Sequence, residues 1–156
     1  MPDIEYVDDR METEELLERL CPPVRNWFID KFPDFTEPQK VAIPRILKGE
    51  HLLLCSPTGS GKTLTAFLTI IDDLVRGALD GTLPDSVQCV YISPIKALAN
   101  DIEKNLLGPL GEIKERFLPS RAKEIKVGLR TGDTPQSDRE KMLRKPPHIL
   151  ITTPES

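Results

Sequence analysis

A run of small and polar residues that ends in Gly-Lys-Thr has the composition of a loop that binds nucleotide phosphates. The run is Ser56-Pro57-Thr58-Gly59-Ser60-Gly61-Lys62-Thr63, and it stands between an apolar segment and an amphipathic one. Glycines let the backbone of such a loop turn so that successive N–H groups face phosphate oxygens. The Lys62 ammonium can then reach the β- and γ-phosphates, and the Thr63 hydroxyl can coordinate Mg²⁺. The spacing therefore predicts a nucleotide site built by residues 57–63, with Lys62 as the catalytic group that stabilises phosphate charge.

Ser56 stands where the general phosphate-loop pattern has its first glycine. A small residue still fits there, and a small residue other than glycine is more typical of helicases than of kinases at this position. The alternative is an ordinary Gly/Ser surface turn that happens to contain a lysine. The apolar segment before the run and the helical pattern after it favour phosphate binding instead.

Composition and length are those of one globular domain. The chain has 156 residues, of which 38% are apolar and 29% charged. No apolar run approaches the roughly 18–20 residues of a membrane span, and the acidic N-terminus has no signal-peptide pattern, so we expect a cytoplasmic protein without a membrane partner. Cys21, Cys55 and Cys89 form no Cys-x-x-Cys pair, which argues against a disulfide framework or a zinc site.

The negative net charge is concentrated at the N-terminus. The whole chain carries −4, whereas residues 1–18 alone carry −7, so the remainder carries +3. A basic surface for nucleic acid is therefore compatible with the acidic total, although the charge itself does not demonstrate one.

Apolar runs and helical patterns alternate after residue 50. Strands are expected at residues 52–55, 87–92, 125–130 and 148–152, with helices at 64–77, 95–106, 110–117 and 135–143 between them. Three shorter helices are expected earlier, at 13–20 (closed by Pro22-Pro23), 24–31 and 37–48. Residues 1–22 are interpreted as an acidic lead-in with a short helix. Four strands separated by helices predict an α/β fold, with a parallel, doubly wound sheet flanked by helices in residues 23–156.

Three of the expected strands end in short segments of hydroxyl residues and turn formers. These segments are Ser93-Pro94-Ile95-Lys96-Ala97-Leu98-Ala99, Thr131-Gly132-Asp133-Thr134 and Thr152-Thr153-Pro154-Glu155-Ser156. Ligands of open parallel sheets gather at the carboxyl ends of the strands. Hydroxyl groups and backbone N–H groups at those ends are suited to the phosphates of a nucleic-acid strand.

Taken in order, the phosphate loop and the three strand-end segments resemble the motor core of superfamily-two helicases of the DEAD/DEAH type. Their residues are most similar to those of the large helicase-related (Lhr) family. The resemblance runs from about Trp27 to Ser156. It implies a RecA-like first motor domain that binds ATP with Mg²⁺ and moves on single-stranded DNA or RNA.

The resemblance also implies roles for matching positions. Gln39 lies 23 residues before Lys62, where these helicases place a glutamine that recognises adenine, and an aromatic residue should stack on the base. Trp27, Phe28 and Phe32 are the candidates. The alternative for Gln39 is a glutamine on a helix surface. The positions implied for nucleic-acid contacts, some of which are alternatively helix caps or solvated charges, are Ser93, Pro94, Lys96, Ala97, Gly132, Asp133, Thr134, Thr153, Pro154 and Glu155.

No apolar strand in the sequence ends in the Asp-Glu pair that holds Mg²⁺ and orients the attacking water in this family. We therefore expect a first motor domain truncated at its C-terminal end, with a second RecA-like domain of the same parent chain as its partner. By itself it should be inactive, with an unpaired sheet edge. Two alternatives remain at this point: a phosphate-loop kinase or phosphotransferase, and a non-catalytic nucleic-acid-binding module.

Overall fold

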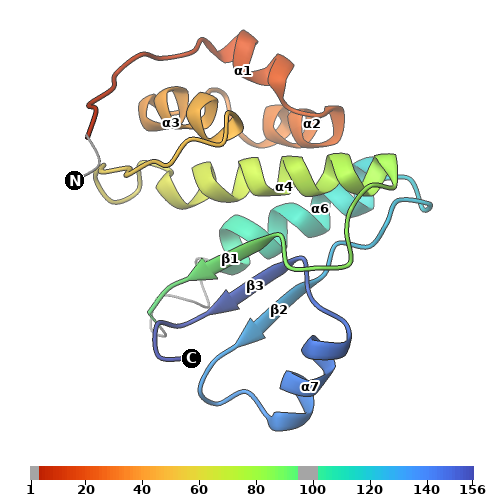
Figure 1. Ribbon diagram of the computed structural model, residues 1–156. Helices are drawn as coiled ribbons and strands as arrows, with labels where there is room; N and C mark the ends of the chain where they lie inside the picture. Colours follow the sequence, from red (N-terminus) through yellow and green to blue (C-terminus); the bar gives the residue numbers. More distant parts are fainter. Residues whose placement is uncertain (1–3, 95–101) are drawn as a thin grey trace.

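The computed structural model describes residues 4–94 and 102–156, which form layers of helices over a small parallel sheet. In Figure 1, α1, α2 and α3 form the outermost layer, α4 and α6 lie between them and the sheet, and α7 lies on the other side of the sheet. The helices are α1 (Thr13–Arg19), α2 (Pro22–Lys31), α3 (Glu37–Leu47), α4 (Lys62–Asp80), the π-helix η1 (Glu103–Leu107), α6 (Gly108–Phe117) and α7 (Gln136–Arg144).

The sheet contains β1 (Cys89–Ile92), β2 (Val127–Arg130) and β3 (Ile149–Thr152), all parallel and in the order β1-β3-β2. In register, Ile92 and Arg130 both pair with Thr152, so the three strands end side by side. These observations confirm the prediction of an α/β fold with a parallel sheet flanked by helices. They also place Ser93, Thr131 and Thr153, the residues of the three polar segments that directly follow the strands, at the same end of the sheet.

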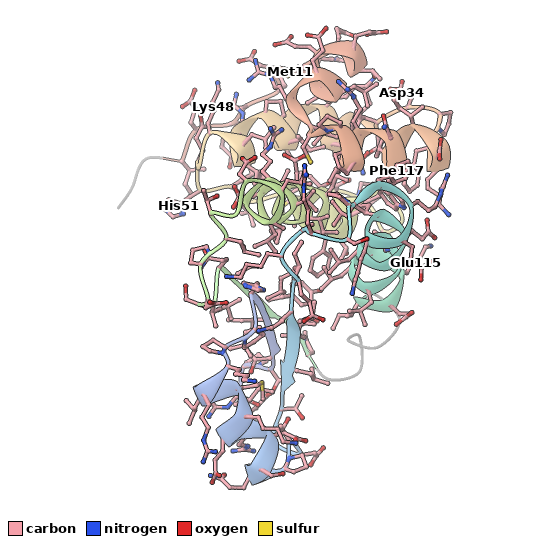
Figure 2. All side chains as sticks on the ribbon, turned by 90° about the vertical axis from the view of Figure 1, so that its right-hand side faces the viewer. Met11, Asp34, Lys48, His51, Glu115 and Phe117 are labelled. Atoms are coloured by element: carbon pink, nitrogen blue, oxygen red, sulfur yellow. The ribbon has the colours of Figure 1, made fainter. Side chains whose placement is uncertain are left out.

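The predicted strand at residues 52–55 is wrong for this structure. These residues are in no strand, Leu53 is 85% exposed and Cys55 is also exposed. Figure 1 shows the segment beside the start of α4, away from the three arrows, and Figure 2 shows His51 at the surface there. The apolar run has the composition of a buried parallel strand, but none of the described strands lies next to it. A strand needs a neighbour for its backbone groups, and the local sequence does not reveal whether one is present.

One apolar core joins the helical layers to the sheet. Leu16 and Leu20 of α1 and its C-cap are buried in the same cluster as Phe67 and Ile71 of α4 and Ile149 of β3. The first 22 residues therefore contribute directly to the core. None of the helices in the described residues has the length and apolar character that a membrane crossing requires.

Two helix boundaries differ from the sequence-based expectation. Helix α4 continues past Gly77 and ends at Gly81, whose φ of 72° gives the left-handed conformation that glycine adopts easily. Gly77 instead allows Leu83 to approach, because a Cβ there would lie 3.3 Å from that residue. Pro22 and Pro23 do not close α1 but begin α2, where a missing N–H is tolerated.

Of the helix expected at 95–106, only the part from Ile102 onward lies within the described residues.

Candidate nucleotide-binding and nucleic-acid-binding site

The phosphate loop (residues 56–63) leads directly into the first turn of α4. Gly59 and Gly61 have φ angles of 83° and 86°, as the sequence predicts for a loop that turns its N–H groups toward one side. Ser56 is not in the left-handed region, so a serine is tolerated where the general pattern has glycine. Its hydroxyl is 2.5 Å from that of Ser60 and links the start of the loop to its middle.

Lys62 folds back over its own loop. Its ammonium donates hydrogen bonds to the carbonyl oxygens of Ser56, at 2.5 Å, and Pro57, at 2.7 Å. An ammonium has three donors on a flexible stem, so these bonds can be exchanged for bonds to phosphate oxygens without moving the backbone. Thr63 is the next residue of α4 and is partly buried.

Helix α3 holds the phosphate loop from the side. The Thr36 hydroxyl donates to the carbonyl of Ser60 at 2.9 Å, and the Gln39 amide nitrogen approaches the carbonyl of Gly61 at 3.5 Å. The other end of that amide accepts the Thr36 N–H at 2.9 Å. Gln39 is only 3% exposed, so the alternative of a glutamine on the helix surface is wrong. Its contact with adenine stays a prediction.

A cleft of about 480 Å³ opens beside the loop, between α2, the start of α3 and the η1–α6 segment. Among the three aromatic candidates, Phe28 is 2% exposed and stacks on Phe35 at 4.0 Å, and Trp27 is 3% exposed. Phe32 lines the cleft and is 36% exposed. Of these three, Phe32 therefore has the largest accessible surface for a ligand.

The wall of the cleft opposite the loop is fixed by Glu112 of α6. Its carboxylate accepts the Trp27 indole N–H and the Lys31 ammonium, each at 2.9 Å. The hydrogen bond from Lys31, followed by that from Trp27, lowers the pKa of Glu112. Glu112 carries no local motif, and no feature of the sequence indicates that α6 would lie beside α2.

The strand ends bring together two of the predicted nucleic-acid segments. The Ser93 N–H donates to the carbonyl of Thr152 at 3.1 Å, directly beside the buried Thr153. The Thr153 hydroxyl is 2.9 Å from that of Ser156, which closes a short turn with Pro154 and Glu155 exposed. The predicted contacts at Lys96 and Ala97 lie outside the described residues.

The third strand end forms a compact turn at residues 131–134. The Thr134 N–H donates to the carbonyl of Thr131 at 3.2 Å, and the Thr131 N–H donates to the Thr134 hydroxyl at 2.8 Å. Gly132 and Asp133 are exposed at the tip. Asp133 does not cap α7, because the N-cap position is Pro135 and no side chain hydrogen-bonds there.

Arg139 of α7 is a residue of this region that sequence reasoning missed. Its guanidinium donates to the carbonyl oxygens of Thr131, Gly132 and Thr134. In the sequence it belongs to a basic run with Lys141, Arg144 and Lys145, a pattern more typical of a solvated helix face than of a nucleic-acid groove. Nothing in that run distinguishes an arginine that binds backbone from one that faces solvent.

The sequence matches the DEAD/DEAH box helicase family over residues 36–156, which is most of the chain. The chain belongs to the DEAD/DEAH box helicase family. The match includes the phosphate loop and all three strand ends, and it confirms the resemblance seen in the sequence.

Close relatives of this DEAD/DEAH box helicase chain are Lhr-type proteins. The chain is 48% identical to the ATP-dependent helicase Lhr-Core of Methanocaldococcus jannaschii over 98% of its own length, and 55% identical to that of Methanothermobacter thermautotrophicus over 95%. It spans only 18% and 17% of those proteins. The structure of Mycobacterium smegmatis helicase Lhr bound to ssDNA and AMP-PNP superposes with a TM-score of 0.73, at 44% identity over 90% of this chain and 18% of that one.

Proposed function

We propose that this chain supplies the ATP-binding part of an Lhr-type helicase, in which ATP hydrolysis is coupled to movement along single-stranded nucleic acid. The observation that carries the proposal is the phosphate loop with Lys62 folded over it at the start of α4. The related mycobacterial helicase binds an ATP analogue and ssDNA. Because the chain spans less than a fifth of its relatives, the intact helicase would need further parts, including a second RecA-like domain.

The loop fits the triphosphate of ATP with its metal ion. Backbone N–H groups of the loop and the start of α4 would bind the phosphates, while Lys62 would neutralise charge on the β- and γ-phosphates. Mg²⁺ retains water and phosphate oxygens as ligands and takes few groups from the protein. The single Thr63 hydroxyl is therefore a sufficient donor at this end of the site.

We further propose that the adenine lies in the cleft beside the loop. Phe32 would stack on the base, since it is the most exposed of the three candidate aromatic residues. Gln39 lies at the same cleft and is fixed between Thr36 and Gly61, so its amide is held in one orientation at the base. A volume of about 480 Å³ is within the range of small-molecule sites.

The edge formed by the ends of β1, β2 and β3 would contact the sugar–phosphate backbone of DNA or RNA. Backbone N–H groups and hydroxyls at these positions are suited to phosphates and do not distinguish one base from another. The proposed contacts are Ser93, Pro94, Lys96, Ala97, Gly132, Asp133, Thr134, Thr153, Pro154 and Glu155.

A titration with a fluorescent ATP analogue, with and without Mg²⁺, tests the nucleotide site. We expect Lys62→Ala to weaken Mg²⁺-dependent binding by about 10- to 100-fold, because a hydrogen bond to a charged group contributes roughly 1.5–3 kcal/mol. Lys48→Ala removes an exposed lysine at the end of α3, outside the phosphate loop, and is the matched control.

Unchanged binding by Lys62→Ala would contradict the nucleotide assignment. In the intact helicase, stimulation of ATPase activity by single-stranded nucleic acid is the second expected result. ATP turnover that depends on a small acceptor molecule would favour a phosphotransferase instead. Nucleic-acid binding that does not depend on ATP and is unchanged in Lys62→Ala would favour a non-catalytic nucleic-acid-binding module.

A further inference from the structure

We propose that Arg139 is a positioning residue that shapes the 131–134 turn for contact with a nucleic-acid backbone, without touching the phosphates itself. The inference rests on the proposed function, because it assigns the turn to the nucleic-acid track. It adds a residue that lies outside the strand-end segments. It also gives one member of the basic run a structural role.

The guanidinium of Arg139 is committed to the backbone of the turn. Its Nε donates to the carbonyl of Thr134 at 2.9 Å, and one terminal nitrogen donates to the carbonyls of Gly132, at 2.9 Å, and Thr131, at 3.2 Å. Three of the four carbonyl oxygens of the turn therefore face the same cation. Arginine can do this because its donors are held in a rigid planar fork.

The opposite side of the turn presents N–H groups. The N–H groups of Thr131 and Thr134 are used inside the turn. Those of Gly132 and Asp133 make no hydrogen bond within the described part of the chain, and both residues are exposed. With the carbonyls turned toward Arg139, these two N–H groups point away from it, in the manner of the backbone sites that bind phosphates.

Neighbouring basic residues are placed differently. Lys141 pairs with Asp138 on the surface of α7, at 2.8 Å, and Arg144 is exposed at the last turn. Arg139 alone of these three reaches back to the turn in the structure described. Its positive charge also offsets the partial negative charge of the carbonyls, which would otherwise repel an approaching phosphate.

The test is single-stranded DNA binding by the intact helicase as a function of salt, for Arg139→Lys, Arg139→Gln and the control Arg144→Gln. We expect both Arg139 variants to weaken binding by about tenfold, since lost charge-assisted hydrogen bonds leave the turn unfixed. Arg139→Lys should not restore DNA binding, because a single ammonium cannot bridge three carbonyls. The slope of log affinity against log salt should stay as in the wild type.

A direct phosphate contact predicts a different pattern. In that case Arg139→Lys would retain most of the affinity, and Arg139→Gln would reduce the salt slope by about 0.7, the value for one neutralised phosphate of a single strand. Either result would overturn the positioning role. Wild-type affinity in both Arg139 variants would overturn it as well, while leaving the proposed function intact. Failure of the wild-type helicase to bind single-stranded DNA or RNA would overturn both.

Hydrogen exchange on this chain gives a readout that needs no nucleic acid. The Thr131 and Thr134 N–H groups bond within the turn, so their exchange should accelerate in Arg139→Lys but not in Arg144→Gln. Faster exchange across the whole sheet would show general destabilisation instead, and would contradict a role confined to the turn.

Discussion

Two loops of this domain use a cation from the following helix to bind their own carbonyl oxygens, and the two cations differ in kind. In the phosphate loop, Lys62 donates to the carbonyls of Ser56 and Pro57. In the 131–134 turn, Arg139 donates to three carbonyls through two nitrogens. Lysine is a compact charge on a flexible stem, whereas arginine is a planar fork.

The difference indicates which cation can leave its carbonyls. Two hydrogen bonds from a rotatable ammonium are easily exchanged for bonds to a phosphate, so Lys62 can serve a ligand. Releasing Arg139 would break three bonds to the carbonyl oxygens of the turn at once. The same local solution, a cation behind a polar loop, can therefore provide a ligand-binding group in one place and a structural support in the other.

The largest effect should come from placing the wrong cation in the phosphate loop. Lys62→Arg keeps the charge, but it replaces a compact, rotatable ammonium with a larger planar group that cannot make the same contact with a phosphate. We expect Mg²⁺-dependent binding of a fluorescent ATP analogue to fall by about 10- to 100-fold, the contribution of a hydrogen bond to a charged group. Lys48→Arg, at an exposed position of the helical layer, is the control. Near-normal affinity in Lys62→Arg would show that charge alone suffices, and the contrast between the two loops would fail.

A second test compares the backbones of the two loops. Gly61 has a φ of 86°, and a Cβ there would lie 2.8 Å from the Gln39 amide nitrogen, whereas Gly132 has no positive φ and no atom within 4 Å. Gly61→Ala should therefore lower the free energy of unfolding by at least about 1–2 kcal/mol, the cost of a left-handed residue with a Cβ. Gly132→Ala should be nearly neutral.

Urea denaturation of both variants measures this difference. Gly59→Ala separates its two causes, because Gly59 has a φ of 83° but open space around it. Equal losses in Gly61→Ala and Gly59→Ala would assign the effect to backbone strain alone, and would remove Gln39 from the explanation.

The sequence was sufficient to predict the elements whose pattern is local. The Gly-Lys-Thr spacing located the phosphate loop, and apolar runs located the three paired strands and their common edge. It did not predict that residues 52–55 stand apart, since pairing depends on a neighbouring strand. It also did not predict the burial of Gln39 or the carbonyl contacts of Arg139. Both are tertiary contacts, and side chains of the same types are common on solvated helix faces.

The smallest effect should be on the pH dependence of stability, which should differ between the sheet and the layers of helices above it. His148 is buried at the start of β3, and its Nδ1 accepts the Lys126 N–H at 2.9 Å. Burial, followed by the charges of Lys123 and Lys126, lowers its pKa from the ordinary 6.5. The folded state then binds a proton less readily than the unfolded state, so stability should fall as pH falls through about 6.5.

Unfolding measured between pH 7.5 and 5.5 tests the role of His148. We expect His148→Gln to lose most of this dependence, and His51→Gln, at an exposed position, to retain it. As the pH falls, protection from hydrogen exchange, relative to the intrinsic rate at each pH, should be lost first at the sheet and the 131–134 turn, and later at the phosphate loop. Simultaneous loss at both would show that the two loops share one stabilising framework.

The separation of residues 52–55 from the sheet has a mechanical consequence. The phosphate loop is bonded to α3 and continues into α4, whereas Ser93, Thr131 and Thr153 directly follow the paired strands of the sheet. The helical layer meets the sheet through side chains such as Phe67 and Tyr91, whose rings are 4.8 Å apart. Apolar contacts resist separation but allow small sliding movements, which the directional hydrogen bonds of a sheet do not. A force applied along the strand ends would therefore displace the sheet relative to the phosphate loop before it stretched the backbone of either.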